Sequence, residues 1–373
     1  MIMSWIFSKR KIYTEFTFQE TEFNTLAADK IRLEVGDYVP PWWYNSHIGS
    51  LIQFGSSVNL IFEREIFILP DGSTFGVDWF PRRPSGLVTE KISLHLPGLG
   101  LSSDANVSQI FAKTFADAGY ISGILIPRGL GGIPLVNIKL WNAGRTDDIK
   151  FVIDCLYKRF ASIPASLFLS GFSASSSIVT KALLELAPSL FIAGDHLHVI
   201  GAMGCCVMFD YEETRTKLEA SFLGSFYSFL LAIMNIMILD KNTHIHNKMD
   251  PSVLYKMKSA LQLGQFDSAA HTMNGFLSEK EMCSQISSLP GIQTMPVPFL
   301  SLQPRDDPLH NYSSLDVTNY TVNQRVIFME TSHGNHFGFY EGSSIFDAFR
   351  NTTSYTYPAR VALSFSNSCM GKK

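Results

Sequence analysis

The sequence has little charge and little cysteine, and both shortages exclude large classes of protein. Only 17% of the 373 residues are charged, and the formal net charge is −3. Nucleic-acid binding requires an excess of basic residues, so we expect no nucleic-acid partner. The five cysteines, with Cys205 and Cys206 adjacent, do not form the even, spaced set of a disulfide framework. A reducing compartment, the cytoplasm, is therefore expected.

Long hydrophobic runs are also scarce. Residues 1–16, MIMSWIFSKRKIYTEF, place apolar residues before basic ones and lack a cleavage site, so they do not predict a secretory signal. The stretch 222–239 is free of charge and close to the minimum length of a membrane span. Because Gly224 and Asn235 interrupt it, we favour a buried or lid helix over a membrane span, and whether the stretch touches or spans a membrane stays open.

What the sequence does contain is apolar residues, at 46% of the total, arranged in short runs. Residues 59–81 hold two such runs around Asp71-Gly72, which is a hairpin signal. Further runs alternate with helical patterns. They cover residues 92–98, 121–127, 166–171, 196–206, 297–304 and 325–331. This alternation predicts an α/β fold with a mostly parallel central sheet flanked by helices.

The alternation stops between two of the predicted strands. Residues 210–296 are largely helical in pattern, which predicts a helical cap or lid inserted into the sheet domain. The core is then expected at 59–209 and 297–365, with residues 1–58 as an N-terminal extension that packs on it. No repeat or low-complexity linker indicates a second independent domain.

The segment GFSAS, residues 171–175, follows an apolar run and precedes a helical pattern. A serine flanked by small residues on such a sharp turn is typical of a nucleophile elbow, which makes Ser173 the candidate nucleophile. The amide of Ala174 would then be an oxyanion donor at the helix N-terminus. The alternative is a helix start that is rich in serine, and Ser175 stands where the pattern usually has glycine.

A nucleophilic serine needs a base and an acid to orient that base, and both follow in the chain order typical of one class of hydrolase. Asp306 and Asp307 come after one predicted strand, and His333 and His336 after the next. Taken alone, the two aspartates would indicate only a solvated turn, and the two histidines only a polar loop. Leu99, in a loop after an early strand, would supply a second oxyanion N–H.

The cysteines and histidines do not indicate a metal site. Cys205 and Cys206 are too closely spaced for a CxxC pair, and His244 and His246 form an isolated cluster that is typical of a solvated loop. We therefore expect no metal and no organic cofactor.

Seven ordered segments between residues 38 and 342 resemble the YheT-like branch of the α/β-hydrolases. This family of serine esterases and lipases includes ABHD-type and plant Emb-type proteins. The matching segments are YVPPWWYNSHIGSLIQ, LPDGSTFGVDW, PRGLGGIP and NAGRTDDI, QFDSAAHTMNGF, RDDPLH and GNHFGFYEG. The resemblance implies an α/β-hydrolase fold. It also implies Ser173 as nucleophile, Asp307 as acid and His336 as base, with Leu99 and Ala174 in the oxyanion hole.

The resemblance leaves Asp306 and His333 as neighbours of the site. Asp148 matches an acidic family position, but we interpret it as part of a helix cap and first turn. Two departures concern activity: Ser175 and Ser176 replace a glycine pair, and Asn335 replaces a glycine.

The activity implied is hydrolysis of a carboxylic ester, such as an acylglycerol or another lipid ester, through an acyl-enzyme. Residues 222–239 would line an acyl pocket or rest on a lipid surface. Two alternatives remain open: an acyltransferase that uses the same triad, and a catalytically impaired binding protein with a hydrolase fold.

Overall fold

The computed structural model describes residues 11–47, 59–194, 196–310, 315–336, 338–341 and 356–371. Within these ranges one nine-stranded sheet runs in the order β1-β9-β8-β7-β6-β4-β5-β3-β2. The strands are β1 (Thr14–Phe18), β2 (Glu63–Ile68), β3 (Thr74–Phe80), β4 (Glu90–Leu96), β5 (Ile121–Ile126), β6 (Ala165–Phe172), β7 (Leu197–Cys205), β8 (Phe299–Pro304) and β9 (Val326–Thr331).

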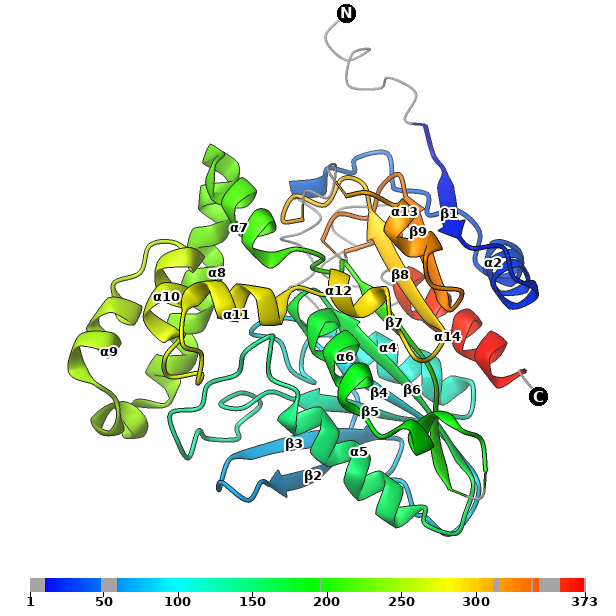
Figure 1. Cartoon of the computed structure of the whole chain (residues 1–373), viewed down its shortest axis with the longest axis horizontal. Coiled ribbons are helices and arrows are strands. Elements are labelled where there is room, and N and C mark those ends of the chain that lie inside the picture. Colours follow the sequence, from blue (N-terminus) through cyan, green and yellow to red (C-terminus); the bar gives the residue numbers. More distant parts are fainter. Residues whose placement is uncertain are drawn as a thin grey trace, which may run out of the picture.

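The sheet is parallel from β5 through β9 and antiparallel at both edges. Helices cover both of its faces (Figure 1). On one face lie α5 (Asp147–Arg159), α6 (Ala174–Glu185) and η1 (Pro188–Phe191). On the other lie α2 (Glu22–Glu34), α4 (Asn106–Asp117) and α14 (Tyr357–Met370). The predicted fold class is thus confirmed.

The central strands are apolar throughout because each buries both of its faces. In β6, Leu167 and Leu169 belong to the core cluster under α5 and α6. Phe168 and Phe172 belong to the cluster under α4 and α14. This alternation follows from the two-residue period of a strand. It also explains why continuous apolar runs predicted these strands.

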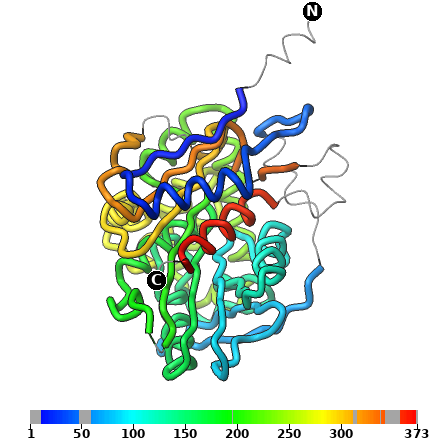
Figure 2. Tube along the Cα trace, turned by 90° about the vertical axis from the view of Figure 1, so that its right-hand side faces the viewer, coloured from blue at the N-terminus to red at the C-terminus, as the bar shows by residue number. Residues whose placement is uncertain are grey.

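The N-terminal segment adds an edge strand and a helix to this core. β1 pairs antiparallel with β9, and α2 lies beside α14 (Figure 2). The rings of Phe23 and Phe365 join the two helices edge to face, with centroids 6.2 Å apart. None of β1, α2 and α14 was predicted as an element. Moreover, α14 continues to Met370, beyond the predicted core boundary at residue 365.

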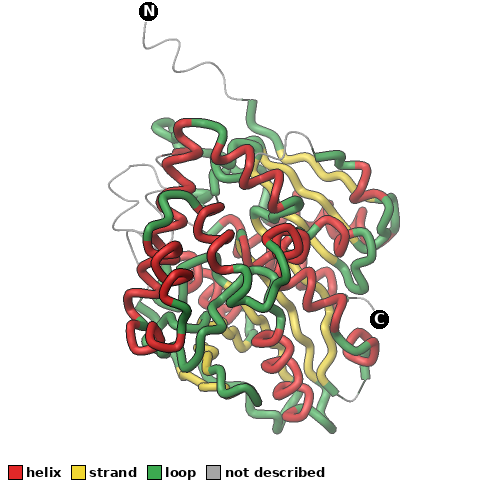
Figure 3. Tube along the Cα trace, turned by 60° about the vertical axis from the view of Figure 1, so that its left-hand side comes forward, coloured by secondary structure: helices red, strands yellow, loops and turns green. Residues whose placement is uncertain are grey.

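Between β7 and β8 the chain leaves the sheet and forms a group of helices, here called the cap (Figure 1, Figure 3). The cap has its own small core, which includes Ile236, Leu239 and Phe266 and extends to Leu135 and Leu140 from the loop after β5. Its elements are α7 (Tyr211–Glu219), α8 (Phe222–Lys241), η2 (Thr243–Lys248), α9 (Pro251–Lys258), α10 (Leu263–Ala270), α11 (Glu279–Ile286) and α12 (Leu289–Ile292). A short helix, α13 (Thr318–Thr321), precedes β9.

The apolar stretch 222–239 lies within α8. Among the described residues, α8 is the single helix whose length and composition would suit a membrane span, and 39% of its apolar window is buried. That is weak evidence for a span, because buried helices of other proteins share both properties. Ala232 and Leu239 are fully buried, whereas Phe222 is exposed.

A buried ion pair fixes the long loop between β5 and α5. The Nε atom of Arg128 donates to both carboxylate oxygens of Asp148, at 2.9 and 3.0 Å, and Nη1 donates to Ser73 Oγ at 2.8 Å. Only 1% of the Arg128 side chain is exposed. Burial raises the pKa of Asp148, and the Arg128 guanidinium opposes that shift.

The expected helix start is present, with Thr146 as the N-cap residue of α5. The Thr146 side chain makes no capping bond and instead donates to Glu185. Asp148 does lie in the first turn of α5, but its carboxylate points into the protein, where it pairs with Arg128. Its role in the structure is that of a buried counter-ion.

We predict that Asp148→Asn lowers the free energy of unfolding by about 3–5 kcal/mol, because it leaves the Arg128 charge buried without a counter-ion. Urea unfolding monitored by circular dichroism measures this change. The control is Asp147→Asn at the exposed neighbouring position, for which we expect a change within about 0.5 kcal/mol. Equal effects of the two substitutions would contradict the assignment.

Candidate active site

Ser173 lies on a sharp turn between β6 and α6, with φ 51° and ψ −125°. This conformation is rarely adopted by residues other than glycine, and it persists only where the surroundings hold it. The amide of Ser173 donates to the Cys205 carbonyl at the end of β7, at 2.9 Å. A Cβ at Gly171 would approach the Ser175 carbonyl oxygen to 2.4 Å, so the strand and helix come close only because residue 171 is glycine.

The serines that follow Ser173 are buried and hydrogen-bonded. Ser175 Oγ donates to the Pro97 carbonyl, which ties α6 to the loop after β4. Ser176 Oγ donates to the carbonyl of Ser173, and Ser177 Oγ lies 3.0 Å from Ser288 Oγ. The serine that replaces the usual glycine at position 175 therefore fits the turn and adds a hydrogen bond to it.

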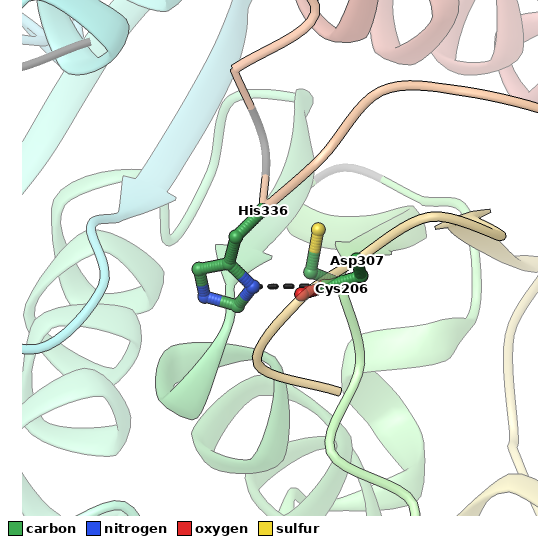
Figure 4. Close-up of side chains that lie close together, drawn as sticks. All are labelled: Cys206, Asp307 and His336. Atoms are coloured by element: carbon green, nitrogen blue, oxygen red, sulfur yellow. Dashed lines mark hydrogen bonds and ion pairs between the residues drawn. The ribbon is translucent and has the colours of Figure 1, made fainter. Parts of the chain in front are cut away.

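Three side chains from distant parts of the sequence meet at this turn. The Nε2 atom of His336 lies 2.9 Å from Ser173 Oγ, and its Nδ1 atom lies 2.8 Å from Asp307 Oδ2. Figure 4 shows the contact between His336 and Asp307. The residues follow β6, β9 and β8, whose carboxyl ends lie at one edge of the sheet. The structure thus brings together the three residues selected from the sequence.

The carboxylate of Asp307 is held ionised in a buried place. Its side chain is fully buried. Burial by itself would raise its pKa, but the nearby His336 and His310 and several hydrogen bonds lower it, and the net shift is downward. Two of these bonds come from the amides of Leu309 and His310, at 2.8 and 3.1 Å. A fixed negative charge therefore faces the Nδ1 side of the His336 ring.

The neighbouring aspartate has different partners. Asp306 accepts a hydrogen bond from the Asn335 amide at 2.9 Å and another from the Tyr44 hydroxyl at 2.6 Å. The amide of Gly334 donates to the same tyrosine oxygen at 3.0 Å. His333 packs edge to face on Tyr44, with ring centroids 5.6 Å apart. Asp306 and Tyr44 therefore position the loop that carries His336.

Within that loop Asn335 adopts φ 47°, in the left-handed region where glycine and asparagine are favoured. Its Oδ1 atom accepts from the Gly338 amide at 2.7 Å. The asparagine that replaces the usual glycine thus takes a backbone conformation that glycine readily adopts, and its side chain also stabilises the turn.

The two expected oxyanion donors line one pocket together with Ser173. Ala174 is the first residue of α6, where a backbone N–H has no partner within the helix. Leu99 follows Gly98 in the loop after β4. Both amides therefore belong to segments that border the hydroxyl of Ser173.

This pocket, here called the cap pocket, lies between the sheet edge and the cap. Most of its lining is apolar, and α7, α8, α10 and α11 all contribute. The apolar lining residues are Leu99, Leu140, Trp141, Ala143, Ala174, Met208, Leu218, Leu231, Leu263, Phe266, Ala270, Ile286 and Leu309. The polar ones are Asn142, Ser173, Tyr211, Thr214, Arg215, Asn235, Asp267, Asn274 and His310.

His310 is a site neighbour that the sequence analysis did not select. Its ring lies edge to face against that of His336, with centroids 4.7 Å apart, and its Nδ1 atom is 3.9 Å from Asp307 Oδ2. Burial lowers its pKa to about 4. His310 is therefore neutral at neutral pH and adds no positive charge beside His336.

The remaining cysteines and histidines were also expected not to bind metal. The Nε2 atom of His246 lies 3.1 Å from the Leu239 carbonyl oxygen, and that of His244 contacts the Leu135 carbonyl. Cys206 lies beside the site, with potential ligand atoms of Cys206, Asp307 and His336 within 4.8 Å of one another (Figure 4). A metal at this place would need Asp307 and His336 as ligands, and these two side chains already form a hydrogen bond with each other.

No family model matches the chain. Among curated proteins, the monoacylglycerol lipase ABHD2 of Danio rerio is 25% identical over 352 residues, which cover 89% of this chain and 79% of that protein. The abhydrolase domain-containing protein 2 of Drosophila melanogaster is 25% identical over 335 residues, covering 83% and 80%. A solved Legionella pneumophila structure aligns with a TM-score of 0.50 and 13% identity over 97% of this chain and 98% of that one, which supports the fold alone. The sheet order and these relatives support the α/β-hydrolase superfamily, and over most of its length the chain is similar to ABHD-type proteins.

Proposed function

We propose that the protein is a serine hydrolase that cleaves carboxylic esters through an acyl-enzyme. The observation that carries the proposal is the hydrogen-bonded line from Ser173 through His336 to the buried carboxylate of Asp307. In such a line the imidazole accepts the hydroxyl proton, while the carboxylate orients the ring and stabilises its charged form.

In the proposed first step, Ser173 Oγ attacks the ester carbonyl carbon and His336 Nε2 takes the hydroxyl proton. The amides of Leu99 and Ala174 hold the negative oxygen of the tetrahedral intermediate. His336 then protonates the leaving alcohol, and the acyl group stays on Ser173. In the second step His336 activates a water molecule that attacks the acyl-enzyme and releases the acid. The scheme uses no metal or organic cofactor.

We infer a lipid ester as the substrate class, with acylglycerols as the first compounds to test. The curated relatives include proteins named monoacylglycerol lipase. In this chain the cap pocket next to Ser173 is lined mainly by apolar side chains, and such a lining suits an acyl chain.

We predict that a fluorophosphonate probe labels the wild-type protein and that Ser173→Ala abolishes both labelling and ester hydrolysis. The matched control is Ser177→Ala, at a buried serine of the same helix whose hydroxyl faces Ser288. This variant should still be labelled. Gel fluorescence and titration of released fatty acid are the measurements. Labelling that persists in Ser173→Ala would refute the proposed nucleophile.

The same assay separates hydrolysis from acyl transfer. With an acceptor alcohol added, we expect free fatty acid as the main product, whereas a new ester as the main product would indicate an acyltransferase. An unlabelled wild-type protein without activity would indicate a binding protein.

The two adjacent aspartates allow a sharper test. We predict that Asp307→Asn lowers kcat on the order of 10³–10⁴-fold, because an amide next to Nδ1 no longer orients the ring or stabilises its positive charge. Asp306→Asn should cost roughly tenfold or less, since its side chain only positions the loop. Steady-state kinetics with one ester measure both. A larger loss in Asp306→Asn would reverse the assignment of the triad acid.

We further propose a peripheral membrane contact at the start of α8 in a protein of the cytoplasm. Phe222 is 90% exposed, Leu223 52% and Phe226 49%, so this end of the helix presents apolar surface to the solvent. Exposed apolar side chains of this kind insert into the boundary between head groups and acyl chains.

We predict that the double substitution Phe222→Ser and Phe226→Ser reduces co-sedimentation with phosphatidylcholine vesicles by about tenfold or more, since each buried phenylalanine contributes about 1.5–3 kcal/mol. Leu277→Ser is the control, because Leu277 is 92% exposed elsewhere in the cap. Equal binding of both variants and wild type would argue against this contact.

A further inference from the structure

The apolar cap pocket contains a group of polar side chains that the proposed reaction does not use. We call Tyr211 and Arg215 of α7, Asp267 of α10 and Asn274 after it the cap polar cluster, and all four line the pocket. The Tyr211 hydroxyl donates to Asp267 Oδ2. Polar groups buried in a pocket of this kind usually fix the orientation of a ligand.

Two atoms of the cluster are buried without a hydrogen-bond partner among the residues that the structure describes. They are Nη1 of Arg215, a donor, and Oδ1 of Asn274, an acceptor. Arg215 Nη1 is 3.6 Å from Asp267 Oδ2, too far for a hydrogen bond, while Nη2 of the same side chain pairs with Glu279 at 2.6 Å. A buried polar atom without a hydrogen bond costs free energy. We therefore expect both atoms to form hydrogen bonds with a ligand from outside the chain.

The charges around the cluster restrict what that partner can be. An anion would meet the carboxylates of Asp267 and Glu279, and a cation would meet the guanidinium of Arg215. An alkyl group would leave both unpaired atoms unsatisfied. Hydroxyl groups can accept from Arg215 and donate to Asn274, because each has one proton and two lone pairs.

We propose that the cap polar cluster binds the hydroxyl groups of a substrate's alcohol portion, and so selects hydroxylated esters over simple alkyl esters. The proposal rests on the proposed esterase function and adds the residues that determine specificity. Because the same pocket is lined by Ser173, one bound ester could reach both the nucleophile and the cluster. Binding of the hydroxyl groups would then decide which end of the ester enters the cap.

The competing explanation is that the cluster only holds α7 to α10 through Tyr211, Arg215 and Asp267. Asn274 separates the two explanations, since its Oδ1 atom takes no part in that network. A structural role predicts equal effects on all substrates. A binding role predicts an effect on hydroxylated substrates in particular.

The test compares a 1-monoacylglycerol with the methyl ester of the same fatty acid. In Asn274→Ala we expect the ratio of the two kcat/KM values to fall about fivefold to tenfold, the loss of one buried hydrogen bond. Ser268→Ala, at an exposed residue of α10, should keep the wild-type ratio. An unchanged ratio in Asn274→Ala would overturn the proposal, whereas a wild-type protein inactive on both esters would instead refute the proposed function.

A binding measurement decides the proposal even in that second case. The ligands are a 1-O-alkylglycerol and the methyl ether of the same alkyl chain, neither of which a hydrolase can cleave. Isothermal titration should show that wild type prefers the glyceryl ether and that Asn274→Ala loses about fivefold or more of this preference. Equal affinity of the wild type for both ethers would overturn the proposal.

Discussion

The arrangement of the site depends on the hydrogen bond between Ser173 Oγ and His336 Nε2, at 2.9 Å. Both partners stand on turns with unusual backbone geometry, φ 51° at Ser173 and φ 47° at Asn335 beside the histidine. Such turns cost free energy, on the order of 1–3 kcal/mol each, and persist only if neighbouring contacts determine them. At the serine these contacts come from β7 and from the close approach of Gly171 to α6.

At the histidine the supporting contacts come from a distant part of the chain. Asp306 and Tyr44 bind the amides of Asn335 and Gly334, so the loop is held from both sides. The Tyr44 hydroxyl itself donates to Asp306 at 2.6 Å. The N-terminal segment is therefore more than a cover for the core, because it fixes the position of the imidazole. This gives a physical role to two family-like segments, the one that contains PPWWY and the RDDPLH segment.

The sequence predicted the parts of the molecule that local patterns determine. Strands buried on both faces are continuous apolar runs, and the turn at Ser173 needs small neighbours. The sequence pattern therefore indicated both the strands and the turn. β1 was missed because its TEFTF pattern mixes polar and apolar residues at a sheet edge. α2 was missed because its burial depends on contact with α14. Tyr44, His310 and Arg215 were missed for a similar reason: tertiary contacts alone bring them to the site.

The groups around His336 favour a single positive charge, the one on its protonated imidazole. When the imidazole takes a proton in the proposed reaction, Asp307 offers a fully buried negative charge 2.8 Å from Nδ1. His310, whose ring touches that of His336, stays neutral because burial lowers its pKa to about 4. A second cation in that place would oppose proton transfer from the serine, since like charges repel strongly in a buried site. The burial that lowers the pKa of His310 thus keeps a second positive charge away from the His336 ring.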